Sequence, residues 1–137
     1  MSFRRLEPWR THLLATLLLV SACSTGPQVA TVTGEVTLDG QPIKDGRISF
    51  TPVDGQGQTG GAEIKDGKFT AEVPLANMKV QINGNKVVGK FKAYDTPESP
   101  VMDQIVELVP PKYNVNSELT LDVKKGLPPQ KYDLKSK

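Results

Sequence analysis

Apolar and polar residues alternate with a period of two through most of the chain from Ala30 onward. Such alternation is typical of antiparallel strands that bury one face and expose the other to water. No window of useful length shows the 3.6-residue period of a helix, so the sequence predicts an all-β fold. Segments 104–109 and 131–134 are weaker strand candidates. The apolar residues that share a face are Val32, Val36 and Leu38; Ile48 and Phe50; Phe69, Ala71 and Val73; Met78, Val80 and Ile82; and Leu119, Leu121 and Val123.

Asx-Gly dipeptides separate these alternating runs. Asp39-Gly40, Asp66-Gly67 and Asn83-Gly84 are predicted to be hairpin turns, because both positions of the pair tolerate a positive φ. Asp45-Gly46 and Asp54-Gly55 mark further turns. Short strands, regular turns and the lack of helices together favour a β-sandwich.

Two stretches interrupt the pattern and are the candidate binding loops. Residues 54–61 contain four glycines and predict a mobile loop, and residues 94–103 contain Pro97 and Pro100 and predict a long irregular excursion. The alternation also predicts a core buried between two sheets, formed by Val36, Ile48, Phe50, Phe69, Val80, Ile82, Leu119 and Leu121.

The N-terminal segment has the organisation of an export signal. Arginines at positions 4, 5 and 10 precede an uncharged apolar run, 13–20, and two small residues precede Cys23. The apolar run has about eight residues, whereas a membrane-spanning helix needs about 20. The order Val20-Ser-Ala-Cys23 resembles the lipobox of bacterial lipoproteins. An ordinary secretory signal with a chance cysteine is the alternative.

The lipobox resemblance implies that the thiol of Cys23 takes a diacylglyceryl group and that the chain is cut just before it. Residues 1–22 are then a signal peptide and residues 23–29 a lipidated linker to a domain at 30–137. In some bacteria an Asp after the cysteine retains a lipoprotein in the inner membrane. Ser24 stands there instead, which favours the outer membrane over the inner one.

The mature chain offers few groups for catalysis. His12 and Cys23 are the only residues of their kinds; one leaves with the signal peptide and lipidation consumes the other. That excludes Ser-His-Asp and Cys-His nucleophilic catalysis and zinc sites of Cys or His. Cleavage leaves 115 residues with 14 basic and 14 acidic side chains, and a neutral chain has no electrostatic reason to bind nucleic acid. We expect no enzyme activity, no cofactor and no metal site.

Six motifs in order make residues 30–137 similar to carboxypeptidase-regulatory-like domains of the transthyretin-like group. This resemblance implies a Greek-key antiparallel β-sandwich of about seven strands, used mostly in non-catalytic accessory or adhesion-like roles. The motifs are VTGEVTLDGQPI at 32–43, GRISFTPV at 46–53, DGKF at 66–69, VPPKYN at 109–114, SELTLDV at 117–123 and KYDLK at 131–135.

Four aspartates invite a calcium hypothesis, since carboxylates and loop carbonyls suit a hard cation. They are Asp39, Asp45, Asp54 and Asp66, but each precedes a glycine and is explained by a turn.

Two other features have a plain structural interpretation. Lys86, Lys90 and Lys92 are predicted to share the outward face of one hairpin arm, where they protect an edge strand. Segment 110–113 (PPKY) fits a proline-rich ligand, but we expect a strand-to-loop crossing with Tyr113 packed at the end of the sandwich.

Together these observations predict a lipid-anchored, non-enzymatic module of the bacterial cell envelope. It would be anchored to the membrane by acyl chains on Cys23 and would bind a protein or glycan surface or act structurally. A carboxylate-dependent envelope enzyme and a calcium-dependent adhesion domain are the alternatives.

Overall fold

The computed structural model describes residues 26–137; the predicted signal peptide 1–22 and the lipidation site Cys23 lie outside this part. The predicted all-β fold is confirmed in the described residues, where no helix is long and apolar enough to cross a membrane. The elements are β1 (Val29–Leu38), β2 (Gln41–Pro42), β3 (Asp45–Pro52), β4 (Gly60–Lys65), β5 (Lys68–Pro74), β6 (Asn77–Lys92), β7 (Val101–Glu107), the 3-10 helix η1 (Pro111–Tyr113), β8 (Thr120–Asp122) and β9 (Gln130–Leu134).

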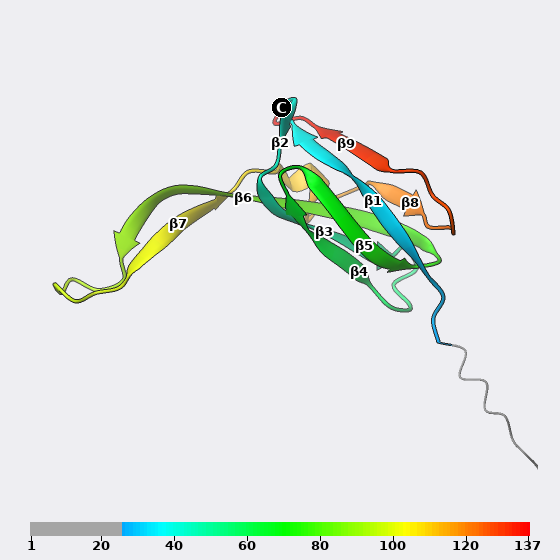
Figure 1. Ribbon diagram of the computed structural model, residues 1–137, viewed down its shortest axis with the longest axis horizontal. Coiled ribbons are helices and arrows are strands. Elements are labelled where there is room, and N and C mark those ends of the chain that lie inside the picture. The colour runs from blue at the N-terminus through cyan, green and yellow to red at the C-terminus, as the bar shows by residue number, and fades with distance from the viewer. Residues whose placement is uncertain (1–25) are drawn as a thin grey trace, which may run out of the picture.

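The strands form a single hydrogen-bonded sheet that curls into a half-barrel (Figure 1). Its order is β2-β1-β5-β4-β3-β6-β7, with β9 beside β1 and β8 beside β6. All pairs are antiparallel except β1 and β9, which run parallel from Gly34 opposite Gln130 to Leu38 opposite Leu134. The C-terminal strand β9 therefore lies beside β1, the first strand of the described residues.

The core fills the inside of the curled sheet. Phe50 is fully buried, its ring 6.3 Å from that of Phe69, and Phe69 lies 6.3 Å from Tyr132. Burial raises the pKa of Tyr132 to about 12, because desolvation disfavours the phenolate. Apolar residues from β1, β3, β4, β5 and β6 supply most of the core: Ala30, Val32, Val36, Ile48, Phe50, Ile64, Phe69, Ala71, Val73, Met78, Val80 and Ile82.

Six of the eight predicted core residues are buried. Leu119 and Leu121 are only partly buried against the cluster. Leu121 lies on β8 and Leu119 just before it. β8 has three residues and pairs with β6 alone. A strand this short at the end of the sheet has little structure around it to cover its side chains.

Two of the predicted hairpin turns are confirmed. Asp39 and Gly40 have φ values of 51° and 81°, and Asp66 and Gly67 have 49° and 78°. Positive φ at both central residues is the conformation that joins twisted strands through two residues. Asp66-Gly67 joins β4 to β5, and its Gly67 nitrogen donates a hydrogen bond to the Ile43 carbonyl.

Asn83-Gly84 and Asp45-Gly46 are not turns, so those two predictions are wrong. They lie inside β6 and β3, where Gly46 is directly opposite Gly84 and Arg47 opposite Asn83. A Cβ on Gly46 would collide with the Asn83 carbonyl oxygen, and one on Gly84 would lie 3.1 Å from Ile43 Cγ2. These glycines permit close approach of strands and core side chains, and neither has a positive φ.

The glycine-rich loop is shorter than predicted. Residues 53–59 connect β3 to β4, while Gly60 and Gly61 already belong to β4 opposite Phe50 and Ser49. A Cβ on Gly60 would lie 2.8 Å from the Glu72 carbonyl oxygen. This glycine too lets strands come close together.

Candidate functional site

A long two-stranded arm is the most distinctive feature of the surface (Figure 1). β6 has 16 residues, and its first half pairs with β3 as far as Asn85. Its second half pairs only with β7 and extends away from the half-barrel. We call residues 86–106 the arm. The irregular part predicted at 94–103 is confined to 93–100, and the strand predicted at 104–109 runs instead from Val101 to Glu107.

The arm carries most of the exposed apolar side chains. Of the eleven large exposed hydrophobic residues in the described chain, eight belong to the arm and are 38–69% exposed. Exposed apolar side chains gathered on one part of a soluble protein can mark an interaction site. The eight are Val87, Val88, Phe91, Tyr94, Val101, Met102, Ile105 and Val106.

A β-bulge at Val88 changes which side chains share a face of the arm. Lys86 lies opposite Val106, whereas Lys90 lies opposite Asp103, with 3.8 Å between Lys90 Nζ and Asp103 Oδ1. Positions 103 and 106 of one regular strand point to opposite faces. Lys86 therefore faces away from Lys90 and Lys92, and the prediction that all three share a face is wrong.

The two long edges of the arm differ in their protection. The free edge of β6 carries three lysines and the bulge, both of which discourage edge-to-edge pairing. β7 ends the path of the sheet, and its outer edge has no strand partner among residues 26–137. Its sequence, VMDQIVE, contains neither lysine nor proline. β7 is thus an open edge of seven residues.

Glu107 fixes the base of the arm to the body. Its Oε1 accepts hydrogen bonds from the Gly84 nitrogen at 2.7 Å and the Val109 nitrogen at 2.9 Å. Its Oε2 accepts a third from Asn83 Nδ2 at 3.0 Å. A carboxylate is suited to this position, because it accepts at both oxygens and bonds to a charged group are the stronger ones.

We expect Glu107→Ala to lower the free energy of unfolding by about 1–3 kcal/mol, because two backbone nitrogens lose their acceptor. Glu107→Gln should cost less, since its carbonyl oxygen still accepts from both nitrogens and only the bond from Asn83 is lost. Urea denaturation of the two variants and the unaltered protein measures the difference. Equal losses for both variants would contradict this role for the carboxylate.

The tip of the arm is held by short-range hydrogen bonds. The Tyr94 nitrogen donates to Ser99 Oγ at 2.6 Å, and the Ser99 nitrogen donates to the Thr96 carbonyl at 3.1 Å. Ser99 is buried, while Tyr94 is among the most exposed apolar residues of the described chain. The tip thus displays an aromatic ring on a hydrogen-bonded loop.

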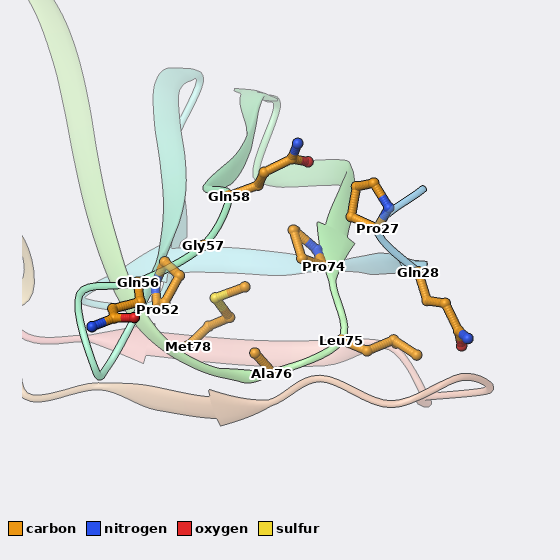
Figure 2. Close-up of a pocket in the computed structure, with 10 residues that line it drawn as sticks. All are labelled: Pro27, Gln28, Pro52, Gln56, Gly57, Gln58, Pro74, Leu75, Ala76 and Met78. Atoms are coloured by element: carbon orange, nitrogen blue, oxygen red, sulfur yellow. The ribbon is translucent and has the colours of Figure 1, made fainter. Parts of the chain in front are cut away.

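A pocket of about 380 Å³ lies beside the start of β1 (Figure 2), at the end of the molecule away from the arm in Figure 1. Its walls are apolar, from Pro52, Pro74 and Met78 among others, and loop 53–59 adds the amides of Gln56 and Gln58. Pro27 and Gln28, just before β1, complete it. The predicted binding loop 54–61 therefore borders a hollow that no charged side chain lines.

Three of the four aspartates of the calcium hypothesis make separate interactions. Asp45 Oδ1 is 2.8 Å from Lys65 Nζ, and Asp54 Oδ1 accepts from the Gln56 nitrogen at 2.9 Å. Hydrogen bonds from the side chain of Ser136 and from its backbone nitrogen lower the pKa of the Asp39 carboxyl group. In residues 26–137 no three His, Cys, Asp or Glu side chains gather as a metal site would require.

Segment 110–113 crosses from β7 into η1 and packs onto the body. Tyr113 is partly buried against the core, and its hydroxyl accepts a hydrogen bond from the Lys135 nitrogen at 3.2 Å. This confirms the predicted packing of Tyr113 at the end of the domain.

No protein family, no curated protein and no solved structure matches this chain. The arm carries eight of the eleven large exposed apolar side chains of residues 26–137 and has an open backbone edge. The sequence predicted lysines on a hairpin arm at 86–92 and a candidate binding loop at 94–103, but prolines 97 and 100 and the bulge concealed the pairing of β6 with β7.

Proposed function

We propose that this chain is a lipid-anchored, non-enzymatic module of the bacterial cell envelope that binds another protein through the arm. The observation that carries the proposal is the concentration of exposed apolar side chains on residues 86–106. A two-stranded ribbon is at best marginally stable in water on its own. An arm with apolar residues on both faces is therefore suited to a protein surface that covers it.

The anchor in this proposal is Cys23, six residues before β1. Figure 1 shows the beginning of β1 and the tip of the arm at opposite ends of the long axis. An extended linker of six residues spans about 20 Å. If acyl chains on Cys23 hold the chain on a membrane, the pocket of Figure 2 would lie near that membrane and the arm would extend away from the membrane. With Ser24 after the cysteine, the outer membrane is the proposed location.

A protein fits the arm better than a glycan. Sugar recognition combines hydrogen-bonding side chains with stacking on aromatic rings. The arm exposes two aromatic rings, Phe91 and Tyr94, but most of its exposed apolar residues are aliphatic or Met102, and they lie beside a free backbone edge. Extended segments of other proteins bind such edges by adding a strand. The absence of His and Cys from residues 24–137 supports a role in binding rather than in nucleophilic or zinc-dependent catalysis.

Photocrosslinking in intact cells tests the binding role. A photoreactive amino acid at Met102 should give a discrete protein adduct on illumination of the full-length, membrane-bound chain. Val115 is the matched control, because it is apolar and 70% exposed but lies on the body. Adducts from neither position, or equally from both, would contradict binding through the arm.

A further inference from the structure

We propose that the end of the domain around the pocket of Figure 2 rests on the lipid surface, as a second membrane contact beside the acyl chains on Cys23. We call residues 27–29, 52–58 and 74–78 the pocket end. This inference rests on the lipid anchor of the proposed function and is independent of binding through the arm. Its partner is the headgroup region of a bilayer, and its consequence is a fixed orientation of the domain on the membrane.

The linker joins the domain at the rim of the pocket. Pro27 and Gln28 line the pocket, and the Gln28 carbonyl accepts a hydrogen bond from the Leu75 nitrogen at 2.9 Å. Pro27 follows Cys23 by four residues, so the extended linker reaches at most about 14 Å. Acyl chains on Cys23 would therefore keep the pocket end within that distance of the lipid surface.

Backbone hydrogen bonds hold the other two segments of the pocket end together. The Val53 nitrogen donates to the Asn77 carbonyl at 3.0 Å, and the Gly55 nitrogen donates to the Pro52 carbonyl at 3.0 Å. The loop after β3 is thus fixed to the connection between β5 and β6. The side chains exposed there form a defined surface.

The pocket end exposes apolar side chains next to the apolar walls of the pocket. Outside the arm, three large hydrophobic residues of the described chain are exposed, and two of them belong to the pocket end. They are Val29, which is 44% exposed and follows the lining residue Gln28, and Val53, which is 54% exposed and follows Pro52. Apolar side chains that enter the headgroup region of a bilayer gain the free energy of burial.

The charge of the pocket end also suits a lipid surface. Charged side chains are disfavoured where a protein surface enters the apolar layer, and none of the residues that line the pocket is charged. Figure 2 shows the amides of Gln28 and Gln56 directed away from the centre of the pocket. Asp54 is the one charged residue of the pocket end, and its Oδ1 accepts a hydrogen bond from the Gln56 nitrogen at 2.9 Å. Zwitterionic headgroups are therefore the better partner.

The contact can be weak because the anchor makes it intramolecular. Two exposed valines beside a pocket would hold an untethered domain on a bilayer only briefly. A short linker gives the second contact an effective concentration of roughly millimolar, without any new interaction. The linker thus favours the bilayer over a soluble partner as the occupant of the pocket end.

Fluorescence quenching tests the contact in the full-length lipidated chain, reconstituted in phosphatidylcholine vesicles that contain lipid spin-labelled near the headgroup. An environment-sensitive dye is attached to Val53→Cys, while the lipid blocks the thiol of Cys23. We expect severalfold stronger quenching there than for the dye at Val115→Cys on the body or at Met102→Cys on the arm. Equal quenching at the three positions overturns the inference.

A charge at the pocket end tests whether its apolar side chains make the contact. With the dye on Gln58→Cys, which lines the pocket, Val53→Asp should reduce quenching to the level of the dye at position 115. Val115→Asp is the matched control and should leave the quenching unchanged. The two valines are 54% and 70% exposed, so neither change reaches the core. Equal quenching in the two aspartate variants overturns a contact through Val53.

Flotation of the vesicles distinguishes this inference from the proposed function. Protein that floats with the vesicles, but whose dye at position 53 is quenched no more than the dye at position 115, keeps the anchor and overturns the contact. Protein that does not float overturns the anchor and the contact together. Protein that floats and is quenched at position 53 in a way that Val53→Asp abolishes supports both.

Discussion

Phe50→Ala is expected to lower the free energy of unfolding by about 3–5 kcal/mol, the usual cost of emptying a buried aromatic site. Phe50 is fully buried and packs near Phe69 in the middle of the curled sheet. Its strand has neighbours on both sides: Phe50 lies opposite Gly60 of β4 and Val80 of β6. The surrounding backbone is therefore fixed and cannot collapse into the space that the ring leaves.

This loss is large against the roughly 5–15 kcal/mol that stabilise an ordinary domain. Thr51→Ala is the matched control, since it is the next residue of β3 and points to the outer face; we expect it to cost less than about 1 kcal/mol. Urea denaturation of both variants, followed by circular dichroism, gives the two values. Equal losses would show that the faces of β3 are assigned wrongly, as after a one-residue shift in register.

The strands of the body could be predicted because burial of one face leaves a direct trace in the sequence. Phe69, Ala71 and Val73 are buried while Lys68, Thr70 and Glu72 are exposed, and a period of two admits only one such assignment. The turns Asp39-Gly40 and Asp66-Gly67 followed from local backbone preference alone. Both signals depend only on residues that are adjacent in the sequence, so the sequence alone is enough to predict these strands and turns.

The two wrong turn predictions arose because glycine has two different structural roles. At Gly40 and Gly67 it adopts a positive φ, whereas at Gly46 and Gly84 it lets β3 and β6 lie close to each other and to the core. A dipeptide such as Asn83-Gly84 reads the same in both cases. Whether the glycine forms a turn or allows close packing depends on the neighbouring strand that pairs with it, and the sequence does not show that strand.

The apolar side chains of the arm could not be predicted for a related reason. Apolar residues occupy both of its faces, so its two strands show no apolar-in, polar-out alternation, and the bulge at Val88 shifts the pattern by one residue. The parallel pairing of β9 with β1 joins segments about a hundred residues apart. Neither property depends on adjacent residues.

The second large effect is expected at the anchor. In the lipoprotein pathway that the lipobox resemblance implies, modification of the cysteine thiol precedes cleavage. Cys23→Ala should therefore leave a precursor that keeps its 22 signal residues and takes up no fatty acid. Growth with a clickable fatty-acid analogue should label the unaltered chain and leave the variant without label.

The physical basis is the additive free energy of acyl chains in a bilayer, about 0.8 kcal/mol for each buried CH₂ group, so that two or more chains hold a protein stably where one does not. Thr25→Ala is the matched control, because it changes a residue of the same linker and leaves the thiol in place. It should be cleaved and labelled like the unaltered chain. Equal labelling of Cys23→Ala and Thr25→Ala would contradict lipidation at Cys23 and would favour the alternative of an ordinary secretory signal with a chance cysteine.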